Sequence, residues 1–136
     1  MTYEEAQEEI LTLLKAAWDT TTYDMTYEAV REQRGTDQDP WAFCLIRHAS
    51  GRQDTLGGAG SRQFERQGNL IVTINTPSTS GLSEAYQLAK IVSDAYEGIA
   101  SPLGVWFRNI RINELGRNGT FNQTNVVVEF LYYETK

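Results

Sequence analysis

The alternation of apolar and polar residues divides the chain into two helices and five strands. Apolar residues recur at helical spacing over 2–18 and again over 82–96, and the segments between and after them alternate with period two. A capping box of Thr2 and Glu5 opens the first helix, and Gly98 closes the second. The predicted order is therefore helix, short strand, two strands, helix and two strands.

The third predicted strand alternates most clearly. Phe64, Leu70, Val72 and Ile74 share one face, and its other face is polar and expected to be wet. The other strands are expected within 23–27, 41–49, 105–112 and 121–133. We therefore expect a single α+β domain over 1–136, with a mainly antiparallel sheet of about four to five strands and two helices packed on one face.

A long polar excursion separates the second and third predicted strands. It runs from Ser50 to Asn69 and holds five glycines together with Arg52, Arg62 and Arg66. Compact domains seldom keep so long a connection without a use. We expect a flexible loop at about 50–63, which is either a functional loop or a hairpin tip that orders on a partner.

The net charge of −6 is unevenly distributed along the 136 residues. Residues 1–39 hold ten acidic and three basic residues, whereas residues 40–136 hold eight acidic and nine basic residues. This balance argues against a module that binds duplex nucleic acid, which needs a basic face. It permits an acidic surface of one copy to meet a basic loop of another, although a solvated acidic helix is the alternative.

Composition indicates an ordinary globular protein of a reducing compartment. Hydrophobic residues make up 40% of the chain and charged residues 22%, and no apolar run approaches the ~18 residues of a membrane span. No secretory signal is visible, so we expect an intracellular protein without a membrane partner. The single Cys44 excludes an internal disulfide and a cysteine-based metal site.

No catalytic constellation emerges from the sequence. Cys44 and His48 would lie about 13 Å apart along a strand, too far for a nucleophile and its base. The run Gly57-Gly58-Ala59-Gly60 lacks the lysine and the following helix of a phosphate-binding loop. The carboxylates are scattered, so we expect no enzyme activity, no cofactor and no metal.

Several segments together resemble a known family. They are Pro40-Trp41 at the start of a strand, the loop bearing glycine and arginine, the run Arg66-Gln67-Gly68-Asn69-Leu70-Ile71-Val72 through Pro77, a helix beginning around Gly81, and the closing FLYYE. The pattern is similar to that of the tail terminator (tail completion) proteins of long-tailed phages, of the lambda type and its domain-of-unknown-function relatives. The segment after Trp18 lacks the family's proline-containing turn, and Phe121 replaces a common tryptophan-tyrosine pair, so the subgroup stays open.

The resemblance implies a virion protein that is assembled in the host cytoplasm. It implies a homo-oligomeric ring, usually a hexamer, that caps the tail tube protein, stops polymerisation and meets a head-completion or connector protein. Arg52, Arg62 and Arg66 are then the candidate residues for the oligomer or tube interface. The alternative is a small intracellular ligand-binding or regulatory domain whose mobile loop closes over a small molecule.

Overall fold

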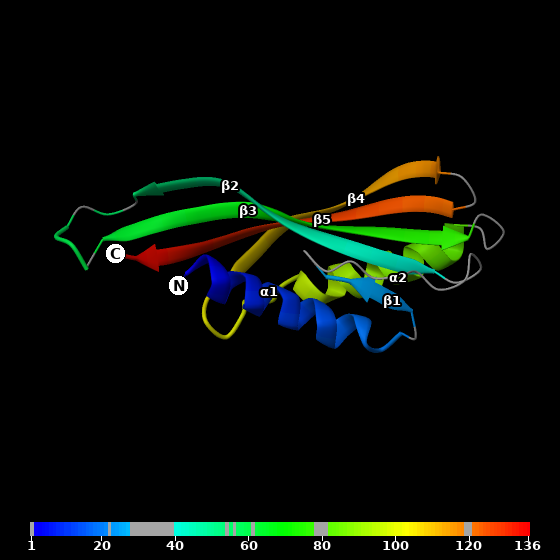
Figure 1. Ribbon diagram of the computed structural model, residues 1–136, viewed down its shortest axis with the longest axis horizontal. Helices are drawn as coiled ribbons and strands as arrows, with labels where there is room; N and C mark the ends of the chain where they lie inside the picture. Colours follow the sequence, from blue (N-terminus) through cyan, green and yellow to red (C-terminus); the bar gives the residue numbers. More distant parts are fainter. Residues whose placement is uncertain are drawn as a thin grey trace.

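The structure is a computed structural model that describes residues 2–21, 23–27, 40–53, 55, 57–60, 62–77, 82–118 and 121–136. A strongly twisted sheet carries both helices against one face, and the two chain ends lie at the same end of the molecule (Figure 1). The order of elements is the predicted one. The elements are α1 (Tyr3–Trp18), β1 (Asp24–Thr26), β2 (Trp41–Gln53), β3 (Gln63–Pro77), α2 (Leu82–Tyr96), β4 (Trp106–Asn118) and β5 (Phe121–Thr135).

The sheet has five strands in the order β1-β2-β3-β5-β4. The short β1 runs parallel to β2, and the three other neighbouring pairs are antiparallel. The predicted α+β class, the mainly antiparallel sheet and the two helices on one face are therefore confirmed. We use "inner face" for the side that carries the helices and "outer face" for the other side.

The helix ends follow from local chemistry. Thr2 Oγ1 accepts a hydrogen bond from the Glu5 amide at 3.2 Å, and the Thr2 amide donates to Glu5 Oε2 at 3.3 Å, which completes the predicted capping box. Gly98 has a φ of +69° just after α2, a conformation that glycine adopts without strain. From the sequence alone, either Ser80 or Ser83 could cap α2; Ser83 lies inside the helix, and Ser80 lies outside the described residues.

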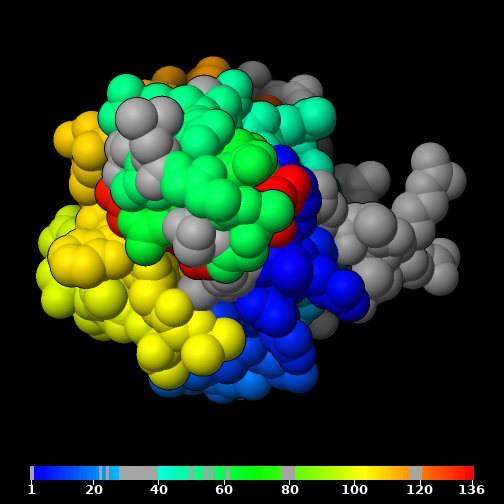
Figure 2. Space-filling model, turned by 90° about the vertical axis from the view of Figure 1, so that its left-hand side faces the viewer, coloured from blue at the N-terminus to red at the C-terminus, as the bar shows by residue number. Residues whose placement is uncertain are grey.

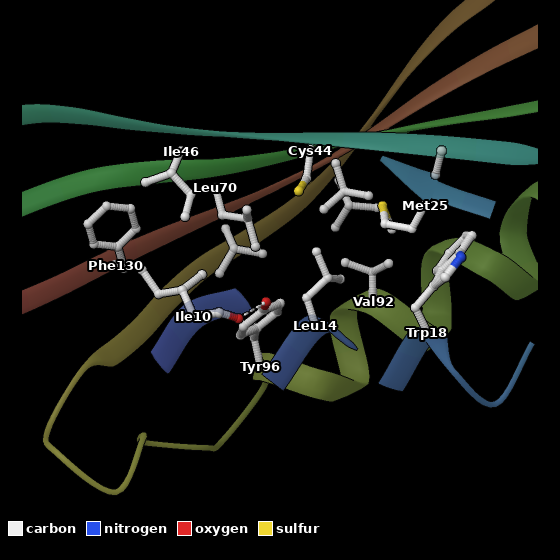
Figure 3. Close-up of a cluster of buried hydrophobic side chains, with 14 of the residues drawn as sticks. Ile10, Leu14, Trp18, Met25, Cys44, Ile46, Leu70, Val92, Tyr96 and Phe130 are labelled. Carbon is white, nitrogen blue, oxygen red and sulfur yellow. Dashed lines mark hydrogen bonds between the residues drawn. The ribbon is translucent and has the colours of Figure 1, made fainter. Parts of the chain in front are cut away.

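A hydrophobic core fills the space between the sheet and the helices (Figure 3). The inner-face residues Leu70, Val72 and Ile74 of β3 are fully buried in it. Tyr96 of α2 reaches across the core and donates its hydroxyl to the carbonyl oxygen of Ile10 at 2.8 Å (Figure 3). Both helices thus bury a stripe of side chains with helical spacing, as the sequence pattern predicts.

The strands around the polar excursion are longer than the pattern predicts. Pairing continues through Gly51 with Arg66 and through Arg52 with Glu65, beyond a bulge between His48 and Ser50. The backbone hydrogen bonds of a hairpin do not require apolar side chains, so hydrophobic alternation underestimates its length. The connection between β2 and β3 is therefore only residues 54–62. Its mobility stays a prediction. The sequence also predicts a loop at 31–40 and a turn at Asn118-Gly119; residues 31–39 and Gly119 lie outside the described residues.

The outer face of β3 is drier than expected. Thr73 and Asn75 are 7% and 1% exposed, although their position in the alternation indicated a wet surface. Thr73 Oγ1 lies 2.8 Å from Asn125 Oδ1, and Gln123 Nε2 donates to Asn75 Oδ1 at 3.0 Å. These cross-strand hydrogen bonds satisfy the Thr73 hydroxyl and Asn75 Oδ1, so a central strand can bury them, whereas the buried Asn75 Nδ2 has no hydrogen-bond partner among the described residues. The prediction of a wet second face was wrong at these residues.

Candidate assembly surface

Arg66 lies in a nearly closed pocket between the sheet and the start of α1. Its guanidinium donates from Nε and Nη2 to Glu134 Oε1, at 3.2 and 3.0 Å. Both side chains are only 12% exposed. The rings of Tyr3 and Phe64 lie 5.2 and 5.4 Å from the guanidinium carbon, which adds cation–π contacts. Arg66 is therefore held as a largely buried ion pair and is not presented to a partner.

Two glycines make room for close contacts in this part of the sheet. A Cβ at Gly51 would collide with the Arg66 side chain, and a Cβ at Gly68 would meet the Arg47 carbonyl oxygen and the ring of Phe130. Gly68 is buried in the middle of the sheet, where a side chain has no space. The glycines around the excursion thus serve close packing as well as turns.

The other two candidate arginines are placed differently. The Arg52 side chain is 72% exposed and forms an ion pair of 3.4 Å with Glu65, which is mostly buried. Arg62 Nε donates to the Gly57 carbonyl oxygen at 3.0 Å, and the Arg62 backbone pairs with that of Lys136. Arg52 and Arg66 occupy adjacent positions in the register and so point to opposite faces. The three arginines do not form one patch, and their role at an interface stays a prediction.

Cys44 and His48, the two residues considered as a nucleophile and a base, also have structural roles. Cys44 is 2% exposed in the core, as expected for a small apolar residue. His48 Nε2 lies 2.7 Å from the Tyr132 hydroxyl, and its ring packs edge-on against Tyr3 and Phe130. Burial raises the pKa of the Tyr132 hydroxyl to about 12, so this phenol stays protonated and is not a base. The arrangement links α1 to the sheet.

A surface that the sequence analysis did not single out lies on the outer face. Trp106 pairs with Leu131 across β4 and β5, and Tyr133 follows two residues later on the same face. Trp106 is 62% exposed and Tyr133 is 38% exposed. They line a shallow depression of about 390 Å³ together with Arg108 and Leu131. Neither helix covers this face.

Basic side chains border this depression. β4 contains a bulge, where Asn109 has a φ of +51°. The bulge lets two arginines of β4 approach one acidic residue of β5. Arg108 Nε lies 3.7 Å and Arg111 Nη1 lies 4.0 Å from the Glu129 carboxylate. Two half-exposed guanidinium groups share one carboxylate, so the local charge is positive. We name Trp106, Arg108, Arg111, Leu131 and Tyr133 together the Trp106 surface.

The exposed flank of α1 has the opposite character. Residues one or two turns apart line a depression of about 470 Å³ together with Tyr27, which directly follows β1. Glu4 and Glu8 contribute carboxylates, Lys15 contributes one cation, and Leu11 and Tyr27 contribute half-buried apolar surface. We name this depression the α1 groove. The acidic N-terminal segment 1–39 identified from the sequence therefore forms a defined surface over part of its length.

One sequence signal could have revealed the Trp106 surface. A tryptophan stands on the polar side of the alternation in β4, where Val105 and Phe107 take the inner positions. Exposed tryptophans on a polar strand face are unusual in monomeric proteins and often mark an interface. The arginines that accompany it come together through the bulge, which hydrophobic periodicity does not indicate.

Within the described part of the chain, no group of three or more His, Cys, Asp and Glu side chains is placed to hold a metal ion. Nor does any helix there have both the length and the apolar character to span a membrane. The pKa of Tyr96 is also raised, because burial disfavours the charged phenolate. Among the described residues, these groups are not arranged as a catalytic centre.

Comparison with known proteins gives similarity at the level of the fold. No protein-family model matches the chain, and no curated protein sequence matches it. A solved protein without a descriptive name shares 12% identity at a TM-score of 0.75, with 100% of this chain and 99% of that chain covered. A chain from the virion of a native gene transfer agent particle shares 16% identity at a TM-score of 0.56, with 98% and 100% covered. This chain therefore shares its fold with a chain of a gene transfer agent virion.

Proposed function

We propose that the protein is a structural component of a phage-like virion that closes the tail. In this proposal, several copies form a ring, usually of six, that caps the tail tube and terminates its polymerisation. The ring then presents the tail side of the junction to a head-completion or connector protein. The protein is assembled in the host cytoplasm and remains in the virion tail.

The end-to-end similarity to a chain of the gene transfer agent virion is the observation that carries this proposal. The similarity covers 98% of this chain and 100% of the virion chain. The sequence pattern supports the narrower role, because its resemblance to tail terminators runs over the same elements. An exposed tryptophan and tyrosine beside arginines also suit a protein that works through contacts with other proteins.

The ligand-binding alternative finds little support among the described residues. The α1 groove is open to solvent and is lined by charged as well as apolar side chains. Small-molecule sites are mostly enclosed and apolar, with a few polar groups that fix orientation. We therefore retain the virion role alone.

The proposal is tested by complementation in the phage or particle that encodes the protein. Deletion should give overlong tubes or tails without heads in electron micrographs, and the wild-type chain should restore normal tails. The double variant Arg52→Glu, Arg62→Glu tests the arginine candidates; if they contact the tube or a neighbouring copy, it should restore few normal tails. Lys90→Glu on α2, an exposed cation paired with Asp94, is the matched control.

Two results would count against these assignments. Normal tail length and complete head attachment after deletion would remove the terminator role. Normal virion yield from the Arg52, Arg62 double variant would leave that role in place but would exclude these two arginines from the interface. Thermal melting of each variant shows whether the fold survives the substitution.

A further inference from the structure

We propose that the Trp106 surface of one copy binds the α1 groove of the next copy, so that the same contact repeats head to tail. This inference rests on the self-association that the proposed function requires. It identifies the two surfaces that meet and the chemistry that joins them. The candidate arginines Arg52, Arg62 and Arg66 are not part of either surface.

The first step is the character of the Trp106 surface. Trp106 leaves 62% of its surface in water, next to Leu131 and the half-exposed Tyr133. Tryptophan, tyrosine and arginine are the residue types that dominate the binding energy of protein interfaces. All three occur here, on a sheet face that no described element covers (Figure 1). The surface therefore has the composition of an interface centre.

The second step is what the partner must supply. Among the described residues, Arg108 and Arg111 share one carboxylate, that of Glu129, so further carboxylates would be attracted to them. The indole N–H of Trp106 needs an acceptor, and its ring needs an apolar floor. The α1 groove offers the carboxylates of Glu4 and Glu8 above Leu11 and Tyr27. Its charge and its mixed lining thus complement the Trp106 surface.

The third step is the position of the two surfaces on one subunit. Trp106 begins β4, the edge strand on one side of the sheet, whereas Tyr27 directly follows β1, the edge strand on the other side. Seen from the end that holds both termini, the gold residues at the left lie away from the blue residues of α1, whereas the yellow residues just before β4 border α1 (Figure 2). Different surfaces meet in such a contact, so it is heterologous and repeats around a ring when the rotation closes.

The experiment uses paired charge reversals in the full chain. The sheet variant carries Arg108→Glu and Arg111→Glu, and the helix variant carries Glu4→Lys and Glu8→Lys. Each variant alone brings like charges together and should weaken self-association at least tenfold in sedimentation velocity or native mass spectrometry. An equimolar mixture should associate again, because each variant meets the other through opposite charges at every contact.

A second substitution tests the apolar part of the contact. Trp106→Ala should weaken self-association at least tenfold, because a truncated hot-spot residue loses most of its contact area. Leu82→Ala on α2 is the matched control, since Leu82 is 51% exposed but lies outside both surfaces, and it should leave association unchanged. Circular dichroism of each variant verifies the fold, and the mixing result does not depend on small stability losses.

The outcomes separate this inference from the proposed function. Unchanged association in both reversal variants, or a mixture that stays dissociated, would overturn the contact while leaving the tail role untouched. A wild-type chain that stays monomeric at high concentration would also overturn it. Restored association in the mixture, together with a failed tail complementation, would support the contact and reject the terminator role.

Discussion

At the residue scale, the structure separates the largely buried Arg66 from the exposed Arg52. Arg66 and Glu134 are each 12% exposed and joined by two hydrogen bonds, whereas the Arg52 side chain is 72% exposed. A charge that loses its partner in a buried site keeps its desolvation cost, but an exposed charge is solvated again by water. The same residue type therefore has a structural role at one position and can serve contacts at the other.

This difference predicts opposite effects of arginine removal. Arg66→Ala should lower the free energy of unfolding by about 3 kcal/mol, because Glu134 would remain buried without its partner. Arg52→Ala should change it by less than about 0.5 kcal/mol. Urea unfolding of the two variants measures both values. Equal small effects would mean that the Arg66 pair is open to water in solution.

The close packing around Gly68 leads to a second prediction at the residue scale, which concerns stability. The added methyl group of Gly68→Ala would lie 2.6 Å from the Phe130 ring, against the backbone of β2, so the sheet must shift. We expect a loss of about 2 kcal/mol, typical of overpacking. Gly58→Ala is the control, because an added Cβ there meets no atom within 4 Å. Matching melting temperatures for both variants would contradict this explanation.

At the element scale, the two helices are tied to one another as well as to the sheet. Tyr96 near the end of α2 donates to the Ile10 carbonyl oxygen of α1 inside the core, and its ring packs 4.7 Å from that of Phe107. Outside the core, Tyr86 of α2 donates to Glu114 of β4 at 2.6 Å. One helix thus contributes a buried tyrosine hydrogen bond to a carbonyl oxygen and an exposed tyrosine hydrogen bond to a carboxylate.

The two tyrosines predict how burial changes the value of a hydrogen bond. Tyr96→Phe removes a donor from a dry site and should cost about 1 kcal/mol of stability. Tyr86→Phe removes an exposed hydrogen bond that water replaces, so its cost should stay below about 0.5 kcal/mol. Chemical denaturation compares the variants. A larger loss in Tyr86→Phe than in Tyr96→Phe would reverse the assigned roles.

At the scale of the whole molecule, buried phenols make stability depend on alkaline pH. Burial raises the pKa of Tyr132 from 10.0 to about 12 and raises the pKa of Tyr96 as well. Between these values the unfolded chain loses protons that the folded chain keeps, so stability falls as the pH rises. Below pH 10 the contribution of both phenols is fully present.

Denaturation at several pH values checks this linkage. We expect the free energy of unfolding to fall steadily between about pH 10 and about pH 12. Tyr132→Phe should reduce that slope, because the variant has one fewer phenol to titrate. An identical slope in the wild-type chain and in Tyr132→Phe would show that Tyr132 titrates normally in the folded state.

The charge distribution predicts how association responds to salt. The acidic α1 groove and the basic Trp106 surface are exposed, so salt screens their attraction. Self-association should weaken as sodium chloride rises from about 0.05 M to about 0.5 M, while the Trp106 contact prevents complete dissociation. Light scattering over a concentration series measures this. Stronger association at high salt would indicate a mainly apolar interface elsewhere.

The sequence by itself determined the order and type of the elements. Hydrophobic periodicity placed both helices, and the capping box of Thr2 and Glu5 marked the start of α1. Alternation in β3 assigned Leu70, Val72 and Ile74 to the core. These features depend on residues close together in the chain, whose local pattern decides which face is buried.

The tertiary structure alone decided which side chains meet across strands. The pairing of Arg66 with Glu134 joins residues 68 positions apart, and the arginines of β4 converge on Glu129 through a bulge. It also buried Thr73 and Asn75 on a face that looked wet, and it brought Trp106 beside Leu131. Register and strand order create these contacts, and no local pattern encodes them because they depend on segments far apart in the chain.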